Sequence, residues 1–523
     1  MLLKTKVRKQ MATVFKKRFS LKNIFGDKAF IKKMILLFFP AIIQNIIISC
    51  ISYVDNFFLA THTPDNFGIY TKTAAVLANQ ILYLPIIFTV AVCFAIGIMT
   101  SQYKGSKQYT LFKESVHWMI ILSFLVNIPF FIAFMGFGSW SIQTYAGAAN
   151  QLTNQSKQID PSNVALFQSI NDWSVQYLNL IMIAQIFYTI SFPLAVAHRY
   201  DGAPFIPLLG SLSALCVNSI LDPVLLIKFA KTPTDAIRFV GIATIVARLV
   251  DISIVLICVF IRKNRATFIF NHWKLQKSTI KDLFKYGWHI VINESLFSIA
   301  TILLSLFLYN YHPYAREGIS TATLVSQFTK LIWPGLSTIV GNLVLSYLGK
   351  HDIKTAKLHS RYIIAWSLVF SIFLAIVLFI ASFFINSVLN KPSDQTSAAI
   401  AKAKEAVDLA KYLEWVLAFQ ILCIGPYAAM NNCIRGSGRK YGSISDTIIM
   451  VIWVLMIGLI TNFVSDPKVS VIGLFTLISA NMAIKLVSTS IMYTKCKWAN
   501  PLTNKINNKV NENKLNYRFS VQK

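Results

Sequence analysis

The chain has 523 residues, of which 55% are apolar and 14% are charged, and its mean hydropathy is +0.56. Ordinary soluble proteins carry about 25% charged residues, so the composition excludes a soluble enzyme, a secreted domain and a disordered scaffold. The net charge of +29 fits either a nucleic-acid partner or the excess of Lys and Arg that membrane proteins place in cytoplasmic loops.

Twelve apolar segments follow one another along the chain, each too long for a strand and long enough to cross a bilayer. The fold class that they predict is an all-α polytopic membrane protein with twelve transmembrane helices. The segments are 34–60, 69–100, 113–137, 176–197, 203–227, 239–261, 286–309, 318–348, 360–389, 409–433, 442–464 and 470–494.

The distribution of Lys and Arg between the loops predicts the orientation. With the N-terminus inside, the inner segments hold 36 of these residues and the outer segments hold 11. This asymmetry indicates that both termini are cytoplasmic and that the number of crossings is even. It also explains the basic net charge, so no nucleic-acid partner is needed. We expect a plasma-membrane protein, bacterial and monomeric.

The sequence is doubled. Residues 97–105 and 341–349 each place two glycines eight positions apart, with a tyrosine two positions before the second glycine. The Arg-x-x-Gly stretches at 199–202 and 435–438 recur at nearly the same offset. A parallel repeat of two six-helix lobes follows. The predicted domains are a basic cytoplasmic segment (1–33), an N-lobe (34–262), a linker (263–285), a C-lobe (286–495) and a polar cytoplasmic tail (496–523).

Ionisable residues inside membrane spans are functional candidates, because their burial costs free energy. In the first half, Asp55, Asn218, Asp222 and Thr244 fall at a similar depth near the outer side, and Gln44 shares the helical face of Asp55. Two carboxylates, an amide and a hydroxyl at one depth fit a proton or Na+ site, since hard cations prefer oxygen ligands. Asp55 and Asp222 would then be the metal ligands if the ion is Na+. The alternative is that these groups only cap helix ends near the headgroups.

The second half carries its own polar faces. Glu294 and Ser298 begin a stripe that predicts a water-lined surface, and Lys330 shares a face with Gln327. A Glu294–Lys330 pair across a cavity is one arrangement that this pattern permits. Glu414 is a further acidic candidate.

Other charged residues in the spans have structural interpretations. Asp446 and Glu414 lie near span ends and could reach the interface, as could the long side chain of Lys485. Arg248 and Asp251, three positions apart, favour a structural ion pair. The chain has no zinc-protease or phosphate-loop motif, so we expect no enzyme activity and no cofactor beyond a coupling ion.

Five stretches resemble the multidrug and toxin extrusion (MATE) family of the multidrug/oligosaccharidyl-lipid/polysaccharide flippase superfamily. They are the proline-bent first helix with its Asp at 40–58, the N-x-x-x-D motif at 218–222, Ala-Thr at 243–244, the G-x-P-x-x-x-N-E-like start at 287–297 and the R-G-x-G turn at 435–442. His289 stands where this family usually has proline.

The resemblance implies two six-helix lobes in a V around a central cavity, and export of cationic or amphipathic compounds by H+ or Na+ antiport. It implies an ion-coupling site at Asp55, Asn218, Asp222 and Thr244, whereas some relatives use acidic residues of the second lobe. The substrate-cavity candidates are Gln44, Glu294, Ser298, Gln327, Lys330 and Glu414.

Two other functions stay open. A lipid-linked headgroup flippase of the same superfamily would use cavity cations, for which Arg248, Lys330 and Lys485 are available, and their orientation would distinguish it from a drug exporter. A non-transporting membrane scaffold or receptor would leave the acidic cluster without a role.

Overall fold

The computed structural model describes residues 24–503 apart from several short stretches. The stretches outside the described part are 144–160, 264–266, 268, 272–274, 312–318, 320–321, 323–324, 327–328, 330, 385–396 and 464–469. Within the described residues the secondary structure is helical and contains no strand. Residues 1–23 of the predicted basic segment and most of the polar tail fall outside this part, as do Lys330 and Gln327. The end of the basic segment, from Lys28, is the first part of a helix rather than a separate segment.

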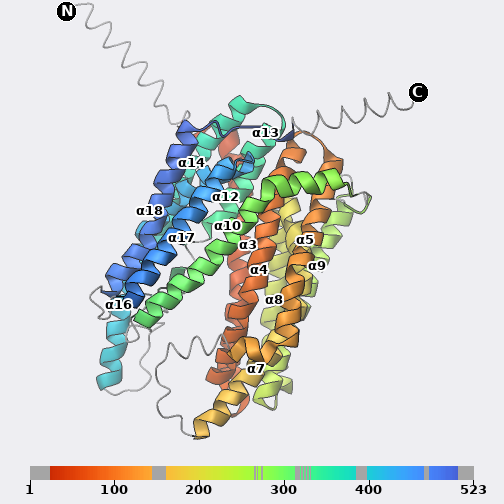
Figure 1. The fold of residues 1–523 in the computed structure, drawn as a ribbon. Helices are drawn as coiled ribbons and strands as arrows, with labels where there is room; N and C mark the ends of the chain where they lie inside the picture. The colour runs from red at the N-terminus through yellow and green to blue at the C-terminus, as the bar shows by residue number, and fades with distance from the viewer. Residues whose placement is uncertain are drawn as a thin grey trace, which may run out of the picture.

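Two groups of helices form two lobes (Figure 1). The N-lobe consists of α3 (Lys28–His62), α4 (Gly68–Gly105), α5 (Tyr109–Gly136), α7 (Pro161–Tyr200), α8 (Phe205–Phe229) and α9 (Pro233–Ile261). The C-lobe consists of α10 (Lys277–Tyr311), α12 (Ile332–Val340), α13 (Ser346–Gly349), α14 (Ile353–Ala381), α16 (Ser397–Gly436), α17 (Lys440–Phe463) and α18 (Val471–Lys495).

These helices confirm the predicted fold class. Within the described residues, eleven helical stretches are long and apolar enough to cross a membrane. One of them, 332–349, combines α12, the π-helical turn Gly341–Leu345 and α13. Helix α10, with 35 residues, adds a further element of spanning length. Helices suit this setting because a bilayer core offers no water to satisfy backbone polar groups.

Two helices extend beyond their apolar parts. Helix α16 begins at Ser397, well before the predicted start at 409, and α10 begins at Lys277, inside the predicted linker. The added turns are rich in Ala and Lys in α16 and in Lys in α10, which are good helix formers. Hydropathy detects only the apolar portion of a helix, so it does not predict these polar turns as helical.

The side chains show the distribution of a membrane protein. Large apolar residues point outward from the bundle, among them Ile227 on α8, Leu455 on α17 and Val487 on α18, each about 60% exposed or more. The interior holds buried polar groups beside the apolar clusters. A surface this apolar must be covered by hydrocarbon rather than by water.

The lobes meet at the end of the bundle where α3 begins and α18 ends, which we call the closed end. There the Gln102 amide of α4 donates to the Gly436 carbonyl of the C-lobe at 2.7 Å and accepts from the Leu502 backbone N–H at 2.8 Å. In the other direction, the Asn342 amide donates to the Arg199 carbonyl at 2.7 Å. Both lobes therefore supply donors and acceptors to this contact.

The repeated glycines permit this contact. A Cβ atom on Gly105 would overlap the Ser346 carbonyl of the other lobe, and one on Gly349 would overlap the Gln102 carbonyl. Only a residue without a side chain lets two helix backbones approach so closely. The doubled motif of the sequence thus becomes a pair of reciprocal backbone contacts.

Away from the closed end the lobes separate. Figure 1 shows the lower ends of α10 and α16 apart from those of α3 and α7. The contact of α3 with the other lobe involves its first half, where Phe38 packs against Gly335. The second half of α3, which carries Asp55, packs within its own lobe against α7 and α9. This arrangement resembles a V that is closed at one end.

We expect Gly105→Ala to open the closed end, because the new methyl group collides with backbone that cannot rotate away. Spin labels at Tyr109 and Lys354, in a background without native cysteines, should report a population with a longer inter-lobe distance. Gly136→Ala is the control, since a Cβ there meets no atom within 4 Å. Identical distance distributions for the two variants would contradict this account of the contact.

Candidate functional site

A buried carboxylate pair lies in the half of the N-lobe that is away from the closed end. Asp55 of α3 is 2% exposed and Asp222 of α8 is fully buried. The Tyr177 hydroxyl of α7 donates to Asp55 Oδ2 at 2.9 Å, and the Thr244 hydroxyl of α9 donates to the same oxygen at 3.1 Å. Asp222 and Asn218 of α8 lie close to the Asp55 side chain. Four helices of one lobe therefore converge on this site.

The site lacks positive charge within the described part of the chain. Asp55 Oδ1, both carboxylate oxygens of Asp222 and the Asn218 amide have no hydrogen-bond partner there. The described ion pairs involve other residues. Two adjacent buried carboxylates repel each other unless one proton or one cation lies between them. The oxygen atoms present can hold either.

The structure brings together all four residues predicted for the ion-coupling site: Asp55, Asn218, Asp222 and Thr244. Sequence reasoning missed Tyr177, because an aromatic residue in a span is usually read as packing. Its position at the outer start of the fourth apolar segment, at the depth of Asp55, was the available signal. A buried tyrosine normally needs a partner for its hydroxyl.

The C-lobe holds a different kind of polar centre. Arg435 of α16 binds Glu294 of α10 at 2.5 Å and Asp446 of α17 at 3.1 Å, and it also donates to the Asn293 side chain. Lys485 of α18 binds the second oxygen of Asp446 at 2.8 Å. Two cations and two carboxylates therefore compensate one another inside the lobe.

Aromatic and amide groups support this ionic cluster. The Tyr427 hydroxyl donates to Asp446 at 2.7 Å and accepts from the Asn431 amide at 3.0 Å. The Lys485 ammonium lies 4.8 Å from the centre of the Phe297 ring. Each charged group thus has specific partners, as a buried charge requires.

Several predictions for the C-lobe are wrong. Lys485 and Asp446 do not reach the interface: both are buried, and each neutralises the other. Glu294 pairs with Arg435, while the predicted Glu294–Lys330 pair involves a residue outside the described part and stays a prediction. Glu414, predicted near a span end, is fully buried. The common reason is that a charge inside a bundle is stabilised more by a close partner than by a long reach to water.

Two of the other predicted substrate-cavity residues, Gln44 and Ser298, form hydrogen bonds within their own lobes. Gln44 is buried, accepts from Arg199 Nη2 at 2.6 Å and donates to Ser211 at 3.3 Å. The Ser298 hydroxyl donates to the Glu294 carbonyl of its own helix at 2.9 Å. Gln327 lies outside the described residues. Gln44 therefore holds Arg199 in place rather than presenting a free amide.

Arg248 of α9 lies over the ring of Tyr188, 5.3 Å from its centre. The predicted ion pair with Asp251, three positions along the same helix, is not among the ion pairs of the described residues. The guanidinium is thus packed against an aromatic face of its own lobe.

Lys485→Met should lower the free energy of unfolding by about 3–5 kcal/mol, because one oxygen of the buried Asp446 carboxylate loses its cation. Adding Asp446→Asn to Lys485→Met should recover part of the loss, since it removes the uncompensated charge. Unfolding in detergent measures both effects. The exposed Lys354→Met is the control and should change stability by less than about 0.5 kcal/mol. Equal stability of the Lys485 and Lys354 variants would show that the buried ion pair contributes nothing.

Comparison with known proteins agrees with this geometry. Residues 40–224 match the MatE family model. The multidrug export protein MepA of Staphylococcus haemolyticus is 26% identical over 208 residues, which cover 40% of this chain and 45% of that protein. The matched segment thus spans less than half the length of this relative.

The match to solved structures covers more of the chain. The eukaryotic MATE transporter AtDTX14 superposes with a TM-score of 0.71 at 17% identity, covering 90% of this chain and 97% of that one. The Vibrio cholerae MATE transporter VcmN in its bent form gives 0.68 at 15% identity, with 89% and 97% covered. Residues 40–224 therefore resemble the MatE family, and the chain has the two-lobed fold of these MATE transporters.

Proposed function

We propose that this chain is a secondary active exporter of small amphipathic or cationic compounds, coupled to the opposite movement of H+ or Na+ through the Asp55–Asp222 site. The observation that carries the proposal is a buried carboxylate pair without a cationic partner in the described part of the protein. The site acts by binding and releasing an ion, and we assign it no enzymatic reaction.

The contrast between the lobes supports the choice of site. In the C-lobe, Arg435 and Lys485 already supply the charge that Glu294 and Asp446 require. In the N-lobe the corresponding charge must come from a mobile ion, held by the oxygen atoms of Asp55, Asp222 and their neighbours. The N-lobe site is therefore the one whose occupancy an ion gradient can change.

The arrangement of the lobes supports alternating access. The described contacts that join them gather at the closed end, while Asp55 lies in the opposite half of α3. A gradient drives transport only if the ion binds one conformation more tightly than the other. With both termini in the cytoplasm of a bacterial cell, as the loop charges predict, this conformation opens outward from the plasma membrane.

The positions of the cations favour an exporter over a headgroup flippase. Lys485 is held by Asp446, and the Arg248 guanidinium lies over Tyr188. Two of the three cations that a flippase reading needs are thus engaged inside their lobes. The name of the relative, a multidrug export protein, supports small organic substrates. A monomer suffices, since the carboxylate site is built within one lobe.

Asp55→Asn should abolish gradient-driven export, because the amide keeps the shape of the carboxylate but removes the charge that holds the ion. Uptake of a fluorescent cationic dye into inverted vesicles, driven by a pH or a Na+ gradient, measures the rate. We expect a loss of at least tenfold with normal expression and membrane insertion. The gradient that drives wild-type uptake identifies the ion.

Asp65→Asn is the matched control, because Asp65 is exposed just beyond the end of the same helix. It should transport at the wild-type rate. If Asp55→Asn also transports at that rate, the carboxylate pair is structural and the proposal is wrong. Absence of dye uptake by the wild-type protein under both gradients would remove the export reading itself.

A further inference from the structure

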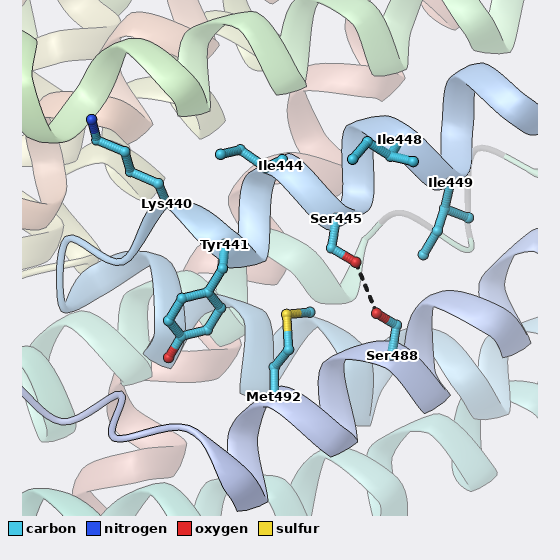
Figure 2. Close-up of a pocket in the computed structure, with 8 residues that line it drawn as sticks. All are labelled: Lys440, Tyr441, Ile444, Ser445, Ile448, Ile449, Ser488 and Met492. Atoms are coloured by element: carbon cyan, nitrogen blue, oxygen red, sulfur yellow. Dashed lines mark hydrogen bonds between the residues drawn. The ribbon is translucent and has the colours of Figure 1, made fainter.

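A groove of about 600 Å³ lies between α17 and α18 of the C-lobe (Figure 2). Its wall on α17 is formed by Ile444, Ile448 and Ile449, which follow one another along the helix. Ile444 and Ile448 are about half exposed. The groove therefore opens on the apolar surface that hydrocarbon covers.

The floor of the groove carries two hydroxyls. The Ser445 hydroxyl of α17 and the Ser488 hydroxyl of α18 share one hydrogen bond of 2.8 Å, which bridges the two helices. Met492 forms the wall on α18, with a flexible side chain that adapts to apolar shapes. The floor and walls thus suit a hydrocarbon chain.

One mouth of the groove is basic. Lys440 begins α17 there and is exposed, with its ammonium 5.4 Å from the centre of the Trp288 ring. Arg439 precedes it, and its Nε atom has no partner within the described residues. Lys495 and Lys497 follow at the end of α18. The stretches 435–445 and 488–503 contain no Asp or Glu.

Tyr441 lies at the same end of the groove. The Tyr441 hydroxyl is buried and has no hydrogen-bond partner among the described residues. A buried hydroxyl of this kind loses free energy unless something donates to it or accepts from it. A phosphate oxygen at the mouth would accept from it. The Lys440 ammonium points away from this hydroxyl (Figure 2), so the long, exposed Lys440 side chain would turn toward the phosphate to pair with it.

We propose that this groove binds an anionic phospholipid, with the phosphate at Arg439, Lys440 and Tyr441 and one acyl chain along Ile444, Ile448 and Ile449. Basic pockets between transmembrane helices are suited to anionic headgroups. The volume lies within the range of pockets that enclose small ligands. The charges select the headgroup, and the apolar walls hold the chain. This site is separate from the carboxylate pair, which lies in the other lobe.

The consequence is a link between lipid composition and the C-lobe. Helices α17 and α18 carry Asp446 and Lys485, whose ion pair lies on their inner side. A lipid wedged along the outer side of the same two helices holds their spacing. The bound lipid would therefore stabilise the helix pair that contains this ion pair.

Native mass spectrometry of the full chain with added phosphatidylglycerol or phosphatidylcholine tests the site. We expect preferential retention of phosphatidylglycerol. Lys440→Gln and Arg439→Gln should each weaken it about fivefold, and together about 25-fold. Lys354→Gln is the control, because Lys354 is an equally exposed cation at the same end of the protein, on α14. It should leave retention unchanged.

A phosphatidylglycerol with a photoreactive acyl chain locates the occupant. Its cross-links should map to residues 444–449 and 488–492, and Ile449→Trp, which fills the groove, should remove them while leaving Lys440 in place. Equal retention of the two lipids, equal effects of the Lys440 and Lys354 variants, or labelling spread evenly around the bundle would each overturn the proposal. So would displacement of the label by a cationic amphiphile but not by phosphatidylglycerol.

Discussion

The need to compensate charge inside the bundle shapes both lobes of this protein. A carboxylate removed from water loses several kcal/mol of hydration, which only a close positive charge or several donors can restore. The C-lobe meets this need with covalently attached cations, since Arg435 and Lys485 surround Asp446 and Glu294. The N-lobe gives Asp55 only the hydroxyls of Tyr177 and Thr244. The Glu294–Asp446 cluster of the C-lobe thus carries its own cations, whereas the proposed function supplies the N-lobe pair with an ion from solution.

The repeat makes this difference easier to see. Arg199 and Arg435 occupy corresponding places, and each reaches the first helix of its lobe. Arg199 meets the neutral amide of Gln44, whereas Arg435 meets the carboxylate of Glu294. A duplicated framework thus keeps its hydrogen-bond geometry while its charges diverge. Divergence of this kind allows one lobe to bind a mobile ion and the other to serve as a fixed support.

The sequence predicted the parts that depend on depth and periodicity. Asp55, Asn218, Asp222 and Thr244 could be grouped because helix direction and position place them at one level of the membrane. The pairs of Lys485 with Asp446 and of Glu294 with Arg435 could not be predicted. Several charged residues lie at a similar depth in the membrane, and the packing of the helices decides which of them pair. The polar first turns of α16 could not be predicted either, because hydropathy identifies only the apolar part of a helix.

The hydrogen bonds at the closed end determine how much free energy is needed to separate the lobes. Both functional groups of the Gln102 amide are occupied, by the Gly436 carbonyl and by the backbone of Leu502. Each such bond contributes about 0.5–1.5 kcal/mol net, and parting the lobes here breaks several of them. Moving a two-state protein from 1:99 to 99:1 needs about 5.5 kcal/mol of differential binding. The difference between an occupied and an empty carboxylate pair is several kcal/mol per uncompensated charge. The two quantities are of the same order, so binding of the proposed ion at Asp55 would supply enough free energy to shift the contact at the closed end of the same lobe.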